Sequence, residues 1–240
     1  MKALKGFALA FNMLSIFPFF KVHDFFKGIN GYSAMFYPLV GFILGSILWG
    51  THSLLQGYIP ATHLAVLIFS LWVLLTGALH LDGFSDTVDG LFVSREQALE
   101  VMKDSHVGGM GMIFTLIFVV LKLSSVIHFE AYYLLPVLLM FSRLNVVFAI
   151  YFYEYISSGV GKILKEELTL KHLLFALFYT TLLAYFFSFL TALIVLFFIL
   201  ILTAKFFTSR LGGLSGDIYG FIIEVTELAL LNYIIILNFS

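Results

Sequence analysis

The sequence predicts an all-α integral membrane protein, a polytopic helical bundle of about seven transmembrane helices plus an N-terminal interfacial or re-entrant helix. Three observations lead to this prediction. Of the 240 residues, 61% are hydrophobic and only 11% are charged, whereas soluble domains carry about 25% charged residues. Seven apolar stretches are long enough, or nearly so, to cross a bilayer. The basic residues recur on one side of these stretches only.

The apolar run from Phe7 to Phe20 comes first, and it does not read as a crossing because lysines stand at both of its ends. A crossing would place those lysines on opposite sides of the membrane. We expect instead a helix that lies against the cytosolic leaflet. A cleaved signal peptide is the alternative, but no small-residue cleavage site follows the run.

The seven predicted spans follow, each bounded by charge, glycine or a turn signal. A helix needs about 20 mostly apolar residues to cross a hydrocarbon core about 30 Å thick. The stretches that meet or approach this length are residues 34–56, 61–79, 108–128, 132–151, 172–187, 190–207 and 219–239. Very short connections at 57–60 and 188–189 predict tight antiparallel helix pairs.

The basic residues support this count, because short cytoplasmic loops collect Lys and Arg. Eleven of the thirteen lie before the first span, after the second and fourth spans, or where the sixth span ends: Lys2, Lys5, Lys21, Lys27, Arg95, Lys103, Lys162, Lys165, Lys171, Lys205 and Arg210. The opposite connections contain none. The pattern predicts a multi-pass protein of the cell membrane whose N-terminus and loop 80–107 face the cytoplasm.

Composition also excludes several classes of function. The net charge of −1 leaves no basic surface for nucleic acid. The absence of cysteine excludes disulfides, thiolate nucleophiles and cysteine metal sites. No linker or internal repeat divides the chain, so one membrane-embedded domain is expected over residues 1–240.

The loop after the second span is rich in acidic residues. Asp82, Asp86 and Asp89 are spaced i, i+4, i+7, so on a helix they project within about 60° of one another. Three carboxylates on one face repel one another. Mg²⁺ would remove this repulsion, since it prefers carboxylate oxygen and keeps positions for water or phosphate. The alternative is an acidic loop that is simply solvated near the lipid headgroups.

A second polar group lies in the segment GGLSGDIYGFIIEVTE, at the start of the last span. Asp217 and Glu224 are seven residues apart and share a helix face. Glu224 and Glu227 fall at membrane depth, where ionisable groups are costly and are kept for function or for pairing. Arg143 of the fourth span is an available partner, so both interpretations stay open. Lys122 is expected to snorkel to the outer interface.

The segment GALHLDGFSDTVDGLFVS, followed by ALEVMKDSHVGGMG, resembles the cobalamin synthase family, membrane enzymes also called adenosylcobinamide-GDP ribazoletransferases. The likeness continues in LAFNMLSIFP, in FSR at Arg143 and in SRLGGLSGDIYGFIIEVTELALL. It therefore covers most of the chain in order. Family members typically carry an arginine where this chain has His106.

The resemblance implies a transferase that acts in the last assembly step of cobalamin biosynthesis. Adenosylcobinamide-GDP and α-ribazole, or its 5′-phosphate, would give adenosylcobalamin, or its 5′-phosphate, and GMP. A ribose hydroxyl attacks the phosphorus nearest the cobinamide, and GMP leaves. Mg²⁺, or Mn²⁺ in its place, would neutralise the charge that builds on the phosphoryl oxygens.

The resemblance also implies roles for particular residues. Asp82, Asp86 and Asp89 would bind the metal, joined by Asp104 or Asp217, and one of these acids would accept the hydroxyl proton. The remaining candidates would contact the substrate, chiefly its phosphates and the leaving group: Lys103, Arg143, Arg210, Gly213, Gly216 and Glu224.

Two further functions stay open on the sequence. A lipid head-group transferase of the CDP-alcohol phosphatidyltransferase type also transfers phosphoryl groups with Mg²⁺, but two residues separate its first aspartates, whereas three separate Asp82 from Asp86. A cation-coupled secondary transporter would use Asp82, Glu224 and Glu227, yet these acids gather at one end and not at the midplane. Membrane lipid is expected around the bundle, nucleic acid is not a partner, and a homo-oligomer is left open.

Overall fold

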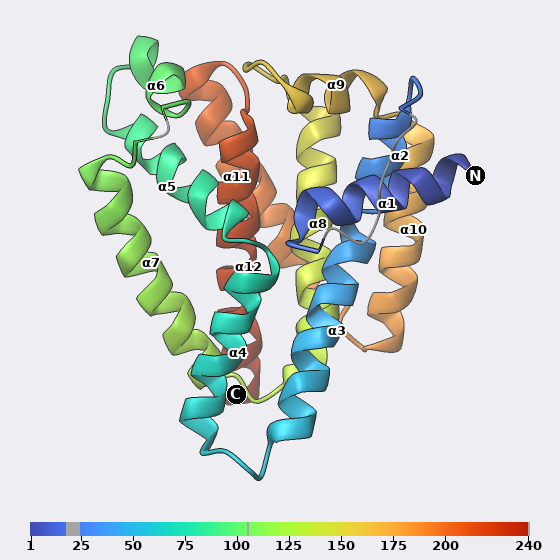
Figure 1. Ribbon diagram of the computed structural model, residues 1–240, viewed down its shortest axis with the longest axis vertical. Coiled ribbons are helices and arrows are strands. Elements are labelled where there is room, and N and C mark those ends of the chain that lie inside the picture. Colours follow the sequence, from blue (N-terminus) through green and yellow to red (C-terminus); the bar gives the residue numbers. More distant parts are fainter. Residues whose placement is uncertain (18–24, 105, 240) are drawn as a thin grey trace.

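The computed structural model describes residues 1–17, 25–104 and 106–239, which form twelve α-helices and one 3₁₀-helix (Figure 1). Their bounds are α1 (Lys2–Leu14), α2 (Ile29–Met35), α3 (Tyr37–Leu55), α4 (Ala61–Leu75), α5 (Leu79–Leu91), α6 (Arg95–Val101), α7 (Gly109–Ile127), η1 (Tyr132–Leu134), α8 (Leu135–Phe152), α9 (Val160–Glu167), α10 (Leu170–Phe186), α11 (Ala192–Leu211) and α12 (Gly216–Phe239). The described residues contain no β-strand, only isolated bridges. The all-α prediction is confirmed.

Five segments in the described part of the chain are long and apolar enough to cross a membrane by themselves: α3, α7, η1 with α8, α11 and α12. Two further candidates pass only as bent pairs, α4 with α5 at 81° and α9 with α10 at 90°. Every predicted span therefore contains a helix, and the count is five to seven. The bends were not predicted.

The bend between α4 and α5 arises at two residues in the left-handed conformation. Gly77 has φ +61° and Ala78 has φ +57°, a region that residues with a side chain rarely adopt. The N–H of Ala78 donates to the carbonyl oxygen of Val73 at 3.0 Å, which closes the end of α4. The chain leaves α4 sharply, and α5 then runs beside α12.

Helix α1 lies across the bundle, near the end where α6 and α9 are found (Figure 1). Its buried residues are small or apolar and include Ala10, Phe11 and Leu14. A Cβ atom on Gly6 would lie 2.5 Å from the Cβ of Tyr32, so a glycine is needed where α1 meets α2. The predicted N-terminal helix is thus present; the end of its apolar run, from residue 18 on, and Lys21 lie outside the described residues.

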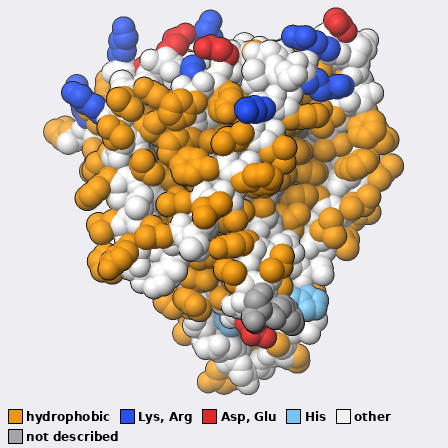
Figure 2. Space-filling view, turned by 180° about the vertical axis from the view of Figure 1, so that it is seen from behind, with side chains coloured by type: hydrophobic (Ala, Val, Ile, Leu, Met, Phe, Trp, Pro, Cys, Tyr) orange, Lys and Arg blue, Asp and Glu red, His pale blue; other side chains and the backbone are white. Residues whose placement is uncertain are grey.

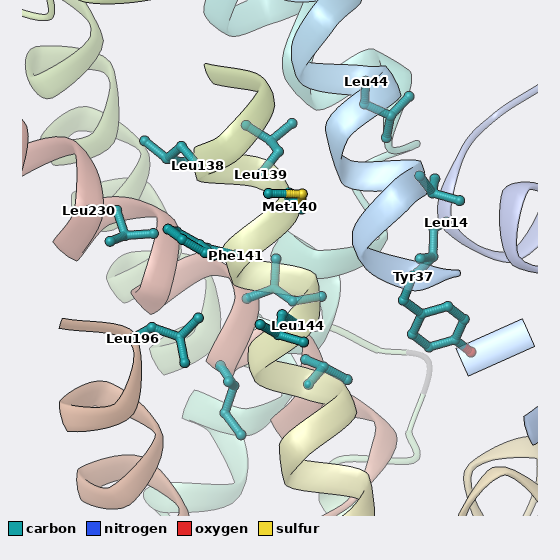
Figure 3. Packing of buried hydrophobic residues seen from close by; sticks show 14 of the residues in the cluster. Leu14, Tyr37, Leu44, Leu138, Leu139, Met140, Phe141, Leu144, Leu196 and Leu230 are labelled. Atoms are coloured by element: carbon teal, nitrogen blue, oxygen red, sulfur yellow. The ribbon is translucent and has the colours of Figure 1, made fainter. Parts of the chain in front are cut away.

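Helix α8 is the centre of the fold, since 94% of its span is buried inside the protein. Figure 3 shows its apolar side chains packed among residues of α3, α11 and α12. Helix α3 approaches it closely at Gly41 and Gly45, where Cβ atoms would lie 2.3 and 2.4 Å from carbonyl oxygens of α8. Because α8 is shielded from lipid, it accommodates the polar Ser142, Arg143 and Asn145, all fully buried.

The outer surface is divided in the way that the sequence predicts. Figure 2 shows a broad hydrophobic band with Lys and Arg side chains gathered at one end. Such a band is the surface that a helical bundle presents to hydrocarbon.

Candidate active site

The candidate site is built where α5 packs against the first turns of α12. A Cβ on Gly83 would lie 2.9 Å from the backbone oxygen of Asp217, and one on Gly220 would lie 3.0 Å from the backbone oxygen of His80. The two glycines therefore permit a contact that a larger residue would push apart. This contact sets the acidic face of α5 beside Asp217.

Three carboxylates lie near this contact. Asp82 is exposed, whereas Asp86 and Asp217 are half-buried. The negative charges of Asp82, Asp217 and Asp89 all act on the carboxylate of Asp86, so these groups lie within electrostatic range of one another. In the described part of the chain, neither Asp82 nor Asp86 forms an ion pair. An excess of negative charge of this kind favours the binding of a cation.

The fit of these residues to Mg²⁺ depends on what else binds the ion. No three His, Asp or Glu side chains among the described residues are arranged to hold a metal ion unaided. Mg²⁺, however, usually binds to one or two carboxylates, several waters and the phosphates of a substrate. Asp82 and Asp86, with Asp217 across the helix contact, fit such a partial set of ligands. The metal stays a prediction. The predicted ion is one that the protein and the substrate would bind together.

Asp89 is engaged differently from the other acids of α5. It is only 8% exposed, and its carboxylate accepts hydrogen bonds from the backbone N–H groups of Gly108 at 2.8 Å and Gly111 at 2.7 Å. These N–H groups belong to the first turn of α7, where a negative charge is favourable. A Cβ on Gly111 would lie 2.2 Å from the Asp89 Oδ2 atom. Gly108 and Gly111 are therefore required by this contact, whereas a Cβ on Gly109 would meet no atom within 4 Å. The metal role predicted for Asp89 is untested.

The connection between α6 and α7 carries Lys103, Asp104 and His106, all exposed. The Lys103 Nζ donates to the Ser158 Oγ at 3.3 Å, and its charge also acts on Asp217. Asp104 accepts hydrogen bonds from the backbone N–H and the Nδ1 atom of His106, at 3.0 and 2.7 Å. The side-chain hydrogen bond raises the pKa of His106 and lowers the pKa of Asp104. Lys103 is thus the predicted cation whose charge acts on Asp217.

Arg210, Gly213 and Gly216 surround the same end of α12. The Arg210 Nη2 donates to the carbonyl oxygens of Leu91 and Val93, at 2.8 and 3.1 Å, and so fixes the turn after α5. A Cβ on Gly213 would lie 2.5 Å from a carbonyl oxygen of the loop after α8, whereas one on Gly216 would meet no atom closer than 3.8 Å. Gly213 is explained by packing; Gly216 leaves open space beside the acids.

A second charged group lies inside the bundle. Lys122 of α7 contacts Glu224 at 2.6 Å and Glu227 at 2.5 Å, and Arg143 of α8 pairs with Glu227. These side chains are at most 5% exposed. The Lys122 Nζ also lies 4.5 Å from the centre of the Trp72 ring. The prediction that Lys122 snorkels to the outer interface is therefore wrong.

This buried group supports the pairing interpretation of the glutamates, while a functional role for them is untested. Two cations meet two anions, so the charges are balanced as the membrane interior requires. The salt bridge expected at Arg143 is present, but through Glu227, while Glu224 pairs with Lys122. Because Arg143 and Glu224 are enclosed and paired, we do not assign them a contact with substrate.

His80 links the two charged groups. It is the second residue of α5, and its Nδ1 atom lies 3.4 Å from an Nη2 atom of Arg143. The backbone of His80 also packs against Gly220 of α12. The start of the acidic helix is thereby attached to the buried pairs. Sequence reasoning missed this role, because a lone histidine gives no sign of its distant partner.

A cavity of about 280 Å³ lies beside the acids, between α1, α3, α5, α8, α9 and α12. Asp82 and Asp217 line it together with many apolar side chains. Its walls come from helices that are far apart in the sequence. No local pattern could have predicted it.

Comparisons with known proteins agree with the resemblance seen in the sequence. The family model described as cobalamin-5-phosphate synthase matches residues 6–235. Proteins named adenosylcobinamide-GDP ribazoletransferase are similar over most of their length. That of Desulfitobacterium hafniense (strain Y51) is 37% identical over 215 residues, 83% of this chain and 84% of the relative. That of Desulforamulus reducens is 36% identical over 231 residues, 91% of each chain. No solved structure matches.

Proposed function

Because the chain belongs to the cobalamin-5-phosphate synthase family, we propose that the surface formed by α5 and the first turn of α12 is the site of its reaction, the last assembly step of cobalamin. The observation that carries this proposal is the group of carboxylates, Asp82, Asp86 and Asp217, whose negative charge is in excess where two helices meet at glycines. A transferase that handles a diphosphate needs such a place for a cation.

The reaction joins a nucleoside acceptor to an activated corrinoid. The donor is adenosylcobinamide-GDP, and the acceptor that we propose is α-ribazole or its 5′-phosphate. The acceptor hydroxyl oxygen forms a bond to the phosphorus nearest the cobinamide. The bond between that phosphorus and the bridging oxygen breaks, and GMP leaves with the electron pair. The hydroxyl proton passes to one of the site carboxylates. The protein contributes chiefly positioning and electrostatic stabilisation.

We propose that Asp82, Asp86 and Asp217 hold Mg²⁺, or Mn²⁺, together with the substrate diphosphate. When bound, the ion supplies positive charge against the phosphoryl oxygens. Lys103 would add a further positive charge near Asp217, since its own charge acts on that residue. Asp89 holds α7 in place next to the acids through Gly108 and Gly111.

The end of the bundle that carries Lys and Arg is proposed to face the cytoplasm, because cytoplasmic loops collect these residues. The α5–α12 contact and the loop with Lys103 lie toward that end (Figure 1). Soluble nucleotide substrates would then reach the site from the cytoplasm, while membrane lipid surrounds the hydrophobic band.

The test uses the full-length protein purified in detergent. With adenosylcobinamide-GDP and α-ribazole, or its 5′-phosphate, we expect GMP and the joined corrinoid in equal amounts. A parallel reaction offers CDP-alcohol substrates, and product from these alone would contradict the proposed function. Chelation by EDTA should stop GMP release and added Mg²⁺ or Mn²⁺ should restore it; release that EDTA does not diminish would refute the metal.

A further inference from the structure

We propose that the cavity beside Asp82 and Asp217 binds the base of the acceptor nucleoside, an inference that rests on the function proposed above. The cavity supports this proposal by its size, by the chemistry of its walls and by two buried polar atoms that have no partner within the described residues. One of the two substrates is thereby assigned to a defined place in the fold.

Size separates the two substrates. The cavity holds about 280 Å³, whereas pockets for drug-sized molecules span roughly 300–1,000 Å³. A bicyclic aromatic base with part of its ribose is of this size. The corrin ring with its side chains is several times larger and cannot enter. The cavity therefore suits the acceptor and not the corrinoid half of the donor.

The walls favour a mostly apolar ring over a polar one. Apolar side chains from five helices line the cavity: Leu14, Leu79, Val146, Ile150, Leu164 and Ile223. The benzimidazole base of α-ribazole is flat and largely apolar, so its burial there is favourable. Guanine, the base of the donor, carries several donors and acceptors that such walls would leave unpaired. The chemistry of the walls and the size of the cavity thus both favour the base of the acceptor.

Two lining residues carry polar atoms that lack a partner. His80 is 3% exposed and Tyr219 is 7% exposed, and both line the cavity. Within the described residues, the Nε2 atom of His80 and the hydroxyl of Tyr219 form no hydrogen bond. Buried polar groups are normally paired, because an unpaired one costs about 1–3 kcal/mol. Both atoms are closed to solvent, so a ligand with a ring nitrogen and sugar hydroxyls would pair with them once the two side chains rotate toward the cavity.

The position of the acids fixes the direction of the ligand. Asp82 and Asp217 line the same cavity as the apolar residues. A base held among the apolar side chains leaves its ribose beside these carboxylates, where the attacking hydroxyl is needed. Gly216, which has open space beside it, also lines the cavity and leaves room for the sugar.

The first test is Tyr219→Phe. This change removes a hydroxyl that has no partner in the described residues, so thermal stability should not fall. The KM for α-ribazole is expected to rise about two- to tenfold, while the KM for adenosylcobinamide-GDP stays unchanged. A variant whose two KM values both equal those of the wild type would overturn the proposal, as would a rise for the donor alone.

The second test fills the cavity. Val160 lines it from α9, whereas Val120 lies on α7 away from it; the two valines are similarly exposed, 51% and 58%. Val160→Phe should raise the KM for α-ribazole more than Tyr219→Phe does, and Val120→Phe should change neither KM. Equal effects of the two phenylalanines would contradict a specific cavity.

Direct binding separates this inference from the proposed function. If the wild-type protein releases no GMP, the proposed reaction fails, yet equilibrium dialysis with α-ribazole still tests the cavity. Weaker binding to Val160→Phe and Tyr219→Phe than to wild type supports it. Equal binding by all three proteins, as for a cavity that takes a lipid acyl chain, refutes it even if the wild-type protein turns over.

Discussion

Two groups of charged side chains lie along α12, near its contact with α5. They differ in whether their positive and negative charges balance. Inside the bundle, Lys122 and Arg143 meet Glu224 and Glu227, all nearly fully buried. At the start of α12, by contrast, the charge of the exposed Lys103 acts on Asp217, while neither Asp82 nor Asp86 forms an ion pair within the described residues. An ionisable group in hydrocarbon must be paired, whereas one at the surface need not be. The unbalanced group is therefore the one available to a ligand.

The two groups show how structural charges can be told apart from reactive ones in a membrane enzyme. Both groups contain glutamate or aspartate on α12, so residue type does not distinguish them. What distinguishes them is whether the protein itself supplies the opposite charge. His80, within 3.4 Å of Arg143 and at the start of the acidic helix, joins the two.

The largest expected effect comes from the unbalanced group. Asp82→Asn and Asp86→Asn should each lower kcat about 1,000-fold, because a metal contributes several kcal/mol of charge stabilisation. Folding should be unaffected, since removing one of several like charges relieves repulsion. GMP release and thermal unfolding measure the two effects, with Glu96→Gln on the exposed face of α6 as the matched control. Near-normal activity of both aspartate variants would show that the reaction does not need these two carboxylates.

The balanced group should respond in the opposite way. Arg143→Met leaves Glu227 with one cation fewer and should lower stability by about 3–5 kcal/mol, as breaking a buried pair does. The double variant Arg143→Met with Glu227→Gln should recover part of this loss. Unfolding in detergent measures it, with the exposed Arg95→Met as control. If Arg143→Met abolished turnover at wild-type stability, Arg143 would belong to the reaction.

Asp89 sharpens the comparison, because it is an acid of α5 that is already satisfied. Asp89→Asn should cost about 1–3 kcal/mol of stability, since it weakens two charge-assisted hydrogen bonds to α7. The Mg²⁺ concentration for half-maximal activity should change little. A variant that kept its stability but needed much more Mg²⁺ would move Asp89 to the metal group.

The smallest effect concerns His106, whose pKa is raised by its hydrogen bond to Asp104. The interaction stabilises the fold below the unfolded pKa of histidine and is lost as the pH rises through the raised value. The imidazole resonances of His106 should titrate above the ordinary range, and Asp104→Asn should return them to it. A midpoint that does not move would show that the pair does not form in solution.

Much of the fold could be predicted, because hydrocarbon imposes a length on every span. The predicted stretch 132–151 and the observed segment from Tyr132 to Phe152 differ by a single residue. The bends at 81° and 90° could not be predicted, since each rests on local backbone geometry and tertiary contact. The left-handed Ala78 gives no signal in sequence, because alanine normally favours a helix.

The candidate site could likewise be predicted only in part. Spacing alone placed Asp82, Asp86 and Asp89 on one helical face, and α5 is indeed a helix there. Spacing could not show that backbone N–H groups at the start of α7 donate to the Asp89 carboxylate, nor that Lys122 points inward to the glutamates. These contacts join residues 19 to 105 positions apart. The resemblance to a family led to the reaction; the cavity beside the acids required the assembled helices.

During synthesis the buried cations, Lys122 and Arg143, are translated before the glutamates that pair with them. Arg143 and its partner Glu227 are separated by 84 residues, which a ribosome takes roughly 4 to 17 s to translate at about 5 to 20 residues per second. During that interval the nascent chain holds Lys122 and Arg143 without the two glutamates that pair with them in the folded protein. The final helix therefore completes the neutralisation of the interior, and a truncated chain lacking it would be a natural target for membrane quality control.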